Sequence, residues 1–277
     1  MKKKLSLKFP KKKIQNLIIS KKYLGNHLNM KVLNEFGFYV LKNALTKKLV
    51  EKYKNYYYEN IKNQKIKKSD NHITQVIIKE KNKLNNIIKE NKFIKIVKNF
   101  YEGNVGCDFI RIVRKDIYNK DLLFTHQDTG YQSGNTNDKY SLFIALTECN
   151  EFNGGINIFP GTHKYGYLGD VGEISKKITD KFLMLKTNLS DGDILFMNSN
   201  LWHNSYENSN LKDRIYLEVH IQNSFEPNTK YLVLGKSNNE WKISGDTKNL
   251  FTNSRTSRIK ILNKHLSRLK KMINKSL

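Results

Sequence analysis

The stretch that decides how this chain folds is Phe124-Thr125-His126-Gln127-Asp128-Thr129-Gly130. It places an imidazole and a carboxylate two positions apart, and side chains at i and i+2 leave a β-strand on the same face. His126 and Asp128 can therefore reach one point in space, and that point could hold a metal ion. Two ligands leave the coordination sphere incomplete, and the best candidate for a third is His203, far downstream. Two imidazoles and one carboxylate on one side of an octahedron are typical of non-haem Fe(II) oxygenases, which keep the opposite face open.

Short extended segments separated by turn residues surround this stretch. The pattern predicts strands at 108–113, 140–146, 156–159, 194–197 and 214–220. We expect 140–146 and 156–159 to pair as a hairpin around a glycine turn at 153–155. Many short strands with regular turn signals are typical of a β-sandwich or barrel, here from about residue 105 to 224.

Helical signals precede the predicted strands. Gly37 stands where a helix would end before an extended segment, and Thr46 is placed to cap a helix that runs through Tyr57. Apolar residues recur at helical spacing over 82–101 and, less regularly, over 14–23. The sequence therefore predicts a helical layer before the β-rich region.

The composition is basic but does not by itself identify a partner. The 277 residues include 50 Lys+Arg and 25 Asp+Glu, which gives a formal net charge of +25. Such a charge would suit nucleic acid or an anionic membrane. However, the lysines are scattered among many Asn and Ile residues, which favours a general compositional bias, and nucleic acid is a less favoured partner. The 14 Phe and 15 Tyr residues are sufficient to build a core despite a mean hydropathy of −0.63.

The sequence also indicates the compartment. Cys107 and Cys149 are the only cysteines, too few for a disulfide framework or a zinc cluster. No apolar run approaches the roughly 20 residues that span a bilayer, and the basic start at 1–4 is not followed by a signal-peptide segment. These features predict a cytoplasmic protein with no transmembrane segment. Its oligomeric state cannot be inferred from them.

Further motifs follow the first stretch in a fixed order. Residues 159–164 read Phe-Pro-Gly-Thr-His-Lys, residues 192–196 read Gly-Asp-Ile-Leu-Phe, and residues 203–205 read His-Asn-Ser, followed by Asn208 and Arg214. A lone H-x-D motif is weak, but the ordered set is strong. In order and spacing, the chain resembles the phytanoyl-CoA dioxygenase family over about residues 31–224.

The resemblance implies a mainly β protein with flanking helices and a double-stranded β-helix, or jelly-roll, core. Its domains would be a basic lead-in at 1–30, an oxygenase domain at 31–224 and a basic extension at 225–277 packed on that domain. Within the oxygenase domain, the helical layer would cover 31–102 and the jelly roll 103–224.

The resemblance also assigns roles to residues and to cofactors. His126, Asp128 and His203 would be the catalytic ligands of Fe(II). Arg214 would bind the distal carboxylate of 2-oxoglutarate, because a guanidinium offers a planar fork that a lysine cannot reproduce. Ser205 would assist Arg214, and Phe143 would place its ring against the cosubstrate. With O2, and with ascorbate as a candidate stimulant, the implied reaction hydroxylates an aliphatic C–H bond and releases succinate and CO2.

Several polar residues have a structural interpretation beside the functional one. We expect the isolated histidines His27, His72 and His265 to be structural, and also His163, which lies in a turn. His220 shares strand parity with Arg214, so its side chain could face the site, but a structural role is favoured. Strand parity alone leaves open whether Arg111 points into the barrel or toward solvent.

Four rival functions can be weighed against the same residues. A halogenase would lack the carboxylate that Asp128 supplies, and a cupin-type isomerase or storage protein would not need Arg214 at its position. A nucleic-acid demethylase would suit the charge, but the paired arginines those oxygenases carry on the last strand are absent here. A catalytically inactive jelly roll that binds nucleic acid or anionic lipid is the main alternative.

The substrate is a small molecule in the oxygenase interpretation, an acyl-linked or sugar-linked metabolite among others. Three loops, at 62–73, 129–139 and 165–181, are the expected sites of selectivity. Their lysines, including Lys139, Lys176 and Lys177, suggest a substrate that carries a phosphate or carboxylate.

Overall fold

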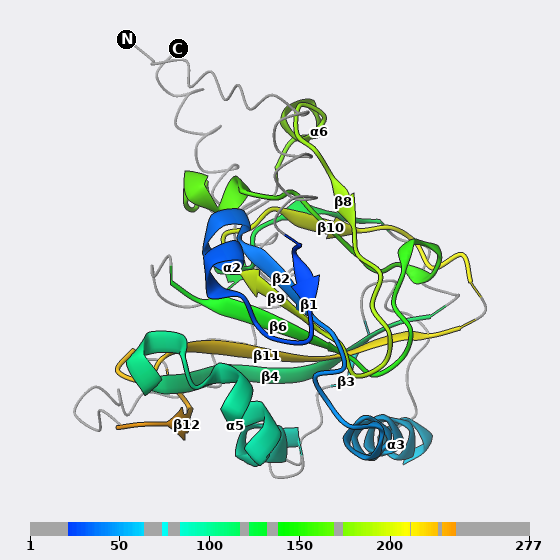
Figure 1. Ribbon diagram of the computed structural model, residues 1–277. Coiled ribbons are helices and arrows are strands. Elements are labelled where there is room, and N and C mark those ends of the chain that lie inside the picture. Colours follow the sequence, from blue (N-terminus) through cyan, green and yellow to red (C-terminus); the bar gives the residue numbers. More distant parts are fainter. Residues whose placement is uncertain are drawn as a thin grey trace, which may run out of the picture. The chain divides into compact units, whose positions relative to one another are not determined.

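Two mainly antiparallel sheets form the core of the protein in the computed structural model (Figure 1). The structure describes residues 22–63, 74–76, 84–116, 122–131, 138–168, 174–210, 212–226 and 229–236. Eight of the strands follow one another as β4 (Val105–Lys115), β5 (Leu123–His126), β6 (Tyr140–Ala145), β7 (Ile156–Ile158), β8 (Leu185–Lys186), β9 (Ile194–Asn198), β10 (His203–Ser205) and β11 (Arg214–Asn223).

The order of these strands identifies the fold. The larger sheet runs β1-β2-β9-β6-β11-β4-β12, with β3 paired to β4, and the smaller sheet runs β5-β10-β7-β8. The chain therefore passes repeatedly from one sheet to the other, which makes a double-stranded β-helix. This confirms the mainly β, jelly-roll fold predicted from the sequence. The outer strands of the larger sheet are β1 (Leu24–Gly25), β2 (Phe38–Leu41), β3 (Thr74–Val76) and β12 (Tyr231–Leu234).

Helices of the N-terminal third adjoin the larger sheet (Figure 1). Helix α2 (Met30–Phe36) ends where predicted, because Gly37 adopts a φ of 78° and its N–H bonds the carbonyl of Leu33. Strand β2 follows at once. Helix α3 (Lys47–Asn63) begins directly after Thr46, whose hydroxyl accepts the N–H of Leu49 at 3.4 Å. The shorter helices are α6 (Lys176–Thr179) and the 3₁₀ turns η3 (Asp128–Tyr131), η4 (Glu151–Asn153) and η5 (Thr162–Tyr165).

The helical segment expected over 82–101 is divided into three pieces. These are η1 (Asn85–Lys89), α5 (Asn91–Val97) and η2 (Phe100–Gly103). The helix breaks at Glu90, which takes an extended conformation with ψ 124° and whose carboxylate binds Lys52 of α3 at 2.8 Å. The apolar pattern is nevertheless used, since Ile87, Phe93 and Val97 are buried in the core.

The prediction that 140–146 and 156–159 pair as a hairpin is wrong. Strand β6 pairs with β9 and β11 in the larger sheet, whereas β7 pairs with β10 and β8 in the smaller one. The turn between them is longer than a hairpin turn. Asn150 and Asn153 cap each other's backbone N–H groups, and Gly154 with a φ of 78° redirects the chain into the other sheet.

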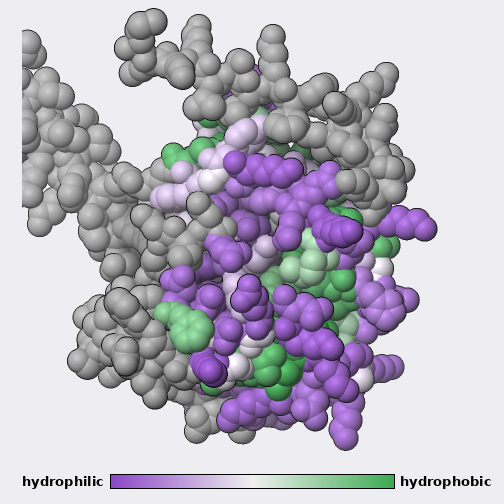
Figure 2. Space-filling view, turned by 60° about the vertical axis from the view of Figure 1, so that its left-hand side comes forward, coloured by the Kyte–Doolittle hydropathy of each residue, from purple (hydrophilic) through white to green (hydrophobic). Residues whose placement is uncertain are grey.

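The C-terminal segment contributes at least one strand to the larger sheet, because β12 pairs with β4. Residues 237–277 of the expected basic extension lie outside the described residues, as do residues 14–21 of the expected N-terminal helix; Lys22 and Tyr23 are not helical. Among the described residues, no helix is long and apolar enough to cross a membrane. Most of the coloured residues in Figure 2 are hydrophilic, with hydrophobic residues in small patches between polar ones.

One buried carboxylate fixes the turn that leads into β9. Asp193 accepts hydrogen bonds from the N–H of Ser190 at 2.8 Å and the N–H of Asn43 at 2.9 Å, and it forms an ion pair with the ammonium group of Lys42. It therefore ties this turn to the segment that joins β2 to α3.

We expect Asp193→Ala to lower the free energy of unfolding by about 2–3 kcal/mol, because it leaves buried donors without an acceptor. Asp191→Ala is the matched control, since Asp191 is exposed in the same turn. Urea denaturation followed by circular dichroism measures both. Equal loss in the two variants would contradict the role given to Asp193.

Candidate active site

The three predicted metal ligands come together at the pair of strands β5 and β10 in the smaller sheet. His126 ends β5 and His203 begins β10, and the two residues are directly opposed in the register of this pair. Asp128 follows at the start of η3. Its Oδ1 atom lies 3.7 Å from Nε2 of His126 and 3.3 Å from Nε2 of His203. All three side chains are buried, and their ligand atoms are close enough to hold one metal ion.

Backbone carbonyls orient both imidazoles. Nδ1 of His126 lies 2.9 Å from the carbonyl of Phe124, and Nδ1 of His203 lies 2.9 Å from the carbonyl of Leu201. A carbonyl can only accept, so each Nδ1 carries a proton, and Nε2 is the ring nitrogen that faces Asp128 and can become a metal ligand once it is deprotonated. This is the arrangement that metal-binding histidines require.

The carboxylate of Asp128 is fixed by a neighbouring hydroxyl. Ser141 of β6 donates to Oδ2 at 2.6 Å, which leaves Oδ1 facing the two imidazoles. Burial alone would raise the pKa of Asp128, but the charge of His203 and hydrogen bonds from both imidazoles hold that pKa well below its usual range. Burial and the nearby His203 lower the pKa of His126. The site thus favours an ionised carboxylate and a neutral His126, the protonation states suited to Fe(II). Burial would lower the pKa of His203, but Asp128 raises it, so His203 must release its Nε2 proton when it binds a metal.

Arg214 lies at the start of β11, fully inside the protein. Its Nη1 atom donates to the carbonyl of Gly154 at 3.0 Å, and its guanidinium stacks 4.8 Å from the ring centre of Tyr216. Its Nε and Nη2 atoms are buried and have no hydrogen-bond partner among the described residues. Burial lowers the pKa of Arg214, yet guanidinium remains charged at neutral pH. Two unpartnered donors on a buried cation fit a carboxylate such as the distal one of 2-oxoglutarate.

The structure also locates the two weaker cosubstrate predictions. Ser205 is buried in β10, and its Oγ accepts a hydrogen bond of 3.2 Å from the ammonium group of Lys115. Lys115 ends β4 directly opposite Arg214. Phe143 of β6 packs edge-on against Tyr216, with ring centres 5.6 Å apart, and so supports the ring beneath Arg214. The roles of Ser205 and Phe143 toward the cosubstrate stay predictions.

A second polar group that sequence analysis had left undecided lies beside Asp128. His220 faces the interior, and its Nε2 lies 2.5 Å from Oε1 of Glu218. Ligand atoms of Asp128, Glu218 and His220 lie within 4.8 Å of one another. Arg111 also turns inward and binds Glu218 through two hydrogen bonds. Sequence analysis missed Glu218 and Lys115. Strand parity with Arg214 was an available signal for Glu218, whereas Lys115 is identified only by its cross-strand register with Arg214.

The remaining histidines and lysines occupy different surroundings. His163 bonds the carbonyl of Asn34 at 3.0 Å and His27 is exposed, whereas His72 and His265 lie outside the described residues. Lys139 is only 1% exposed and pairs with Asp108 at 3.5 Å, so the expectation that it attracts substrate from a surface loop is wrong. Its ammonium group is used within the fold.

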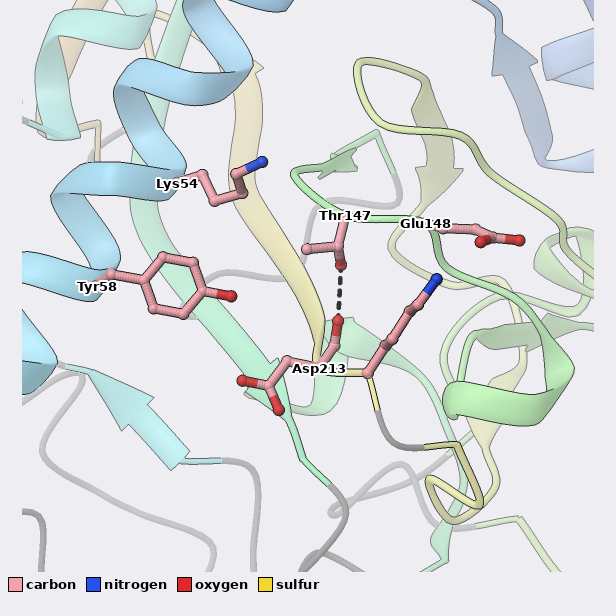
Figure 3. A pocket seen from close by; sticks show the side chains of 6 residues that line it. Lys54, Tyr58, Thr147, Glu148 and Asp213 are labelled. Atoms are coloured by element: carbon pink, nitrogen blue, oxygen red, sulfur yellow. Dashed lines mark hydrogen bonds between the residues drawn. The ribbon is translucent and has the colours of Figure 1, made fainter.

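A separate surface pocket of about 430 Å³ lies between α3 and the turns before β7 and β11 (Figure 3). Its side chains carry charges of both signs, and the hydroxyl of Thr147 donates to the carbonyl of Asp213 at 2.9 Å. It contains no histidine, and it is lined by Lys54, Tyr58, Thr147, Glu148, Lys212 and Asp213. The metal triad is therefore the better candidate for chemistry.

The comparison with protein families shows to which family the chain belongs. The model of the family described as phytanoyl-CoA dioxygenase (PhyH) matches residues 33–216, a span that includes the triad and Arg214. The chain belongs to the phytanoyl-CoA dioxygenase family. It is accordingly a 2-oxoglutarate-dependent non-haem iron oxygenase, with Fe(II) and 2-oxoglutarate as its cofactors. No curated protein matches the sequence.

Solved structures resemble this phytanoyl-CoA dioxygenase family member in fold. The α-ketoglutarate-dependent epimerase SnoN from nogalamycin biosynthesis is 12% identical with a TM-score of 0.61, covering 70% of this chain and 79% of SnoN. EctD from S. alaskensis, solved with 2-oxoglutarate and 5-hydroxyectoine, is 14% identical with a TM-score of 0.60, covering 70% and 74%. AviO1 from Streptomyces viridochromogenes Tue57 is 17% identical with a TM-score of 0.57, covering 73% and 96%.

The hydroxyl of Ser141 gives a direct test of how Asp128 is held. We expect Ser141→Ala to weaken binding of Co(II), a stand-in for Fe(II), by about 10–100-fold, the effect typical of groups that orient a metal ligand. Equilibrium dialysis measures the affinity. Ser209→Ala, an exposed serine outside the site, is the control and should bind metal like the wild type. Unchanged affinity in Ser141→Ala would mean that Asp128 needs no such support.

Proposed function

We propose that this protein hydroxylates an aliphatic C–H bond of a small-molecule, acyl-linked or sugar-linked metabolite and releases succinate and CO2. The observation that carries the proposal is the combination of a buried His-Asp-His triad with a buried arginine that keeps two donors unpartnered. The first suits Fe(II) and the second suits a dicarboxylate cosubstrate. A cytoplasmic location fits the two free, buried cysteines and is part of the proposal.

Each residue of the site has a distinct part in this reaction. His126, Asp128 and His203 would hold iron on one side and leave the other side open, and Arg214 would anchor the cosubstrate by its distal carboxylate. When bound, iron and 2-oxoglutarate supply the oxidising power for C–H cleavage. The protein orients these groups by the hydrogen bonds of Ser141, Phe124 and Leu201. Burial of the triad keeps bulk water from the reacting atoms.

The choice of hydroxylation rests on the presence of Asp128. A carboxylate at this position fills the place that a halogenase would leave for halide. The similar structures include proteins described as an epimerase and a carbocyclase, so the product must be identified directly.

Succinate formation from 2-oxoglutarate is the primary test, with Fe(II), ascorbate and air and without an added substrate. We expect slow uncoupled turnover by the wild type and its loss in His126→Ala and Arg214→Ala. Lys186→Ala is the control, because Lys186 is exposed and pairs with Glu151 at the surface. A wild type that binds neither Fe(II) nor 2-oxoglutarate would overturn the oxygenase and favour a catalytically inactive polyanion-binding jelly roll.

The fork of Arg214 can be tested separately from its charge. Arg214→Lys keeps a cation but loses the planar pair of donors, so we expect the KM for 2-oxoglutarate to rise about 10–100-fold. Affinity for the metal without cosubstrate should stay unchanged, because Arg214 does not contact the triad. An unaltered KM would show that the cosubstrate carboxylate binds elsewhere.

A further inference from the structure

The inner face of β11 carries two polar groups at different distances along the strand. Arg214 and Glu218 are four residues apart on the same face, which is about 13 Å along a strand. Glu218 and His220 lie beside Asp128, whereas Arg214 lies toward the start of the strand. A cosubstrate that extends from the metal toward Arg214 leaves the Glu218 end of the barrel for the substrate. This step rests on the proposed function.

Arg111 belongs to that second group and is held on two sides. It opposes Glu218 across β4 and β11, with Nε 2.6 Å from Oε2 and Nη2 3.2 Å from Oε1. Its guanidinium also stacks on the ring of Phe109 at 4.9 Å, and that ring lies 4.9 Å from the ring of His220. One edge and one face of the guanidinium are therefore fixed before any ligand arrives.

The outer edge of Arg111 remains available. The side chain is 26% exposed, whereas Glu218 is fully buried. Both carboxylate oxygens of Glu218 already accept hydrogen bonds from Arg111, and one also accepts from His220. Glu218 thus orients Arg111 and has little capacity to bind substrate itself. The Nη1 edge of a guanidinium can still bind a second oxyanion with two parallel donors.

We infer that Arg111 anchors the primary substrate by a carboxylate or phosphate group and that Glu218 and Phe109 position it for this contact. Arg111 contacts Glu218, and ligand atoms of Glu218 and Asp128 lie within 4.8 Å of each other. The reacting carbon would therefore be a short distance from the bound oxyanion. Arg111 is then a specificity-determining residue, and Glu218 a positioning residue. A purely structural ion pair would also hold Arg111, but it would confer no preference among ligands.

Four probes of similar size and different charge test this inference: cyclohexanecarboxylate, cyclohexyl phosphate, cyclohexanecarboxamide and cyclohexylmethylammonium. The full chain is first loaded with Mn(II), which stands in for Fe(II) without turnover, and then with 2-oxoglutarate; both steps are followed by calorimetry. Each probe is then titrated into the loaded protein. We expect an oxyanion to bind about tenfold or more tightly than the amide, and the ammonium probe to bind weakest. The tighter of the two oxyanions shows whether the anchor prefers a carboxylate or a phosphate.

The variant Arg111→Gln should abolish the preference for the oxyanion while it keeps a donor for Glu218. Arg111→Lys should retain a weaker preference, because it keeps the charge and loses the fork. The double variant Arg111→Gln/Glu218→Gln removes the whole ion pair and serves if the single variant does not fold. Arg114→Gln is the matched control on the opposite face of β4, where Arg114 pairs with Asp116 and Asp213.

The outcomes separate this inference from the function on which it rests. Absence of Mn(II) and 2-oxoglutarate binding in the wild type would overturn the proposed function and the inference with it. If both bind, the inference alone is overturned by a wild type that binds no probe, or that binds oxyanion and amide equally. It is also overturned if Arg111→Gln keeps the oxyanion preference and only lowers the melting temperature, which is the result expected of a structural ion pair.

Discussion

The register between β5 and β10 is the constraint on which the site depends. His126 and His203 are directly opposed across this pair, which brings their ring centres to 4.1 Å. A slip of one residue would turn either imidazole to the other face of the sheet. The register is held from the other side by β7, whose Ile158 opposes His203. The smaller sheet therefore sets the distance between two predicted metal ligands from distant parts of the chain.

The charged side chains inside the barrel form separate groups, and each group has its own partners. Asp128 lies near the middle, where two imidazoles and the hydroxyl of Ser141 surround it. Arg214 and Lys115 oppose each other toward one end, and Arg111 and Glu218 oppose each other nearer Asp128. Arg111 lowers the pKa of Glu218 against the effect of burial, so a second carboxylate is kept ionised close to the first. A barrel built for packing alone would not place so many charges where each must be compensated.

Sequence analysis found the parts of the site that depend on short spacing and missed those that depend on strand register. His126 and Asp128 were found because two positions along one segment fix their relation, and Gly37 because helix ends have a local signature. The crossing from β6 to the other sheet was missed, since apolar strands next to a glycine turn resemble a hairpin. Glu218 and Lys115 acquire their meaning only from partners on other strands. No local pattern carries that information.

The residue proposed to recognise the charge of the substrate is likewise one that only the strand register reveals. The sequence favoured loop lysines as the groups that attract an anionic substrate. Lys139, however, is buried and its charge is compensated by an ion pair with Asp108. An exposed lysine is a flexible and strongly hydrated point charge, and it discriminates weakly between anions. Arg111 is instead preorganised by Glu218 and Phe109 inside the barrel, where fewer water molecules compete for its donors. In the role proposed for Arg111, the net charge of +25 says less about the substrate than one partly exposed guanidinium near the predicted metal ligands.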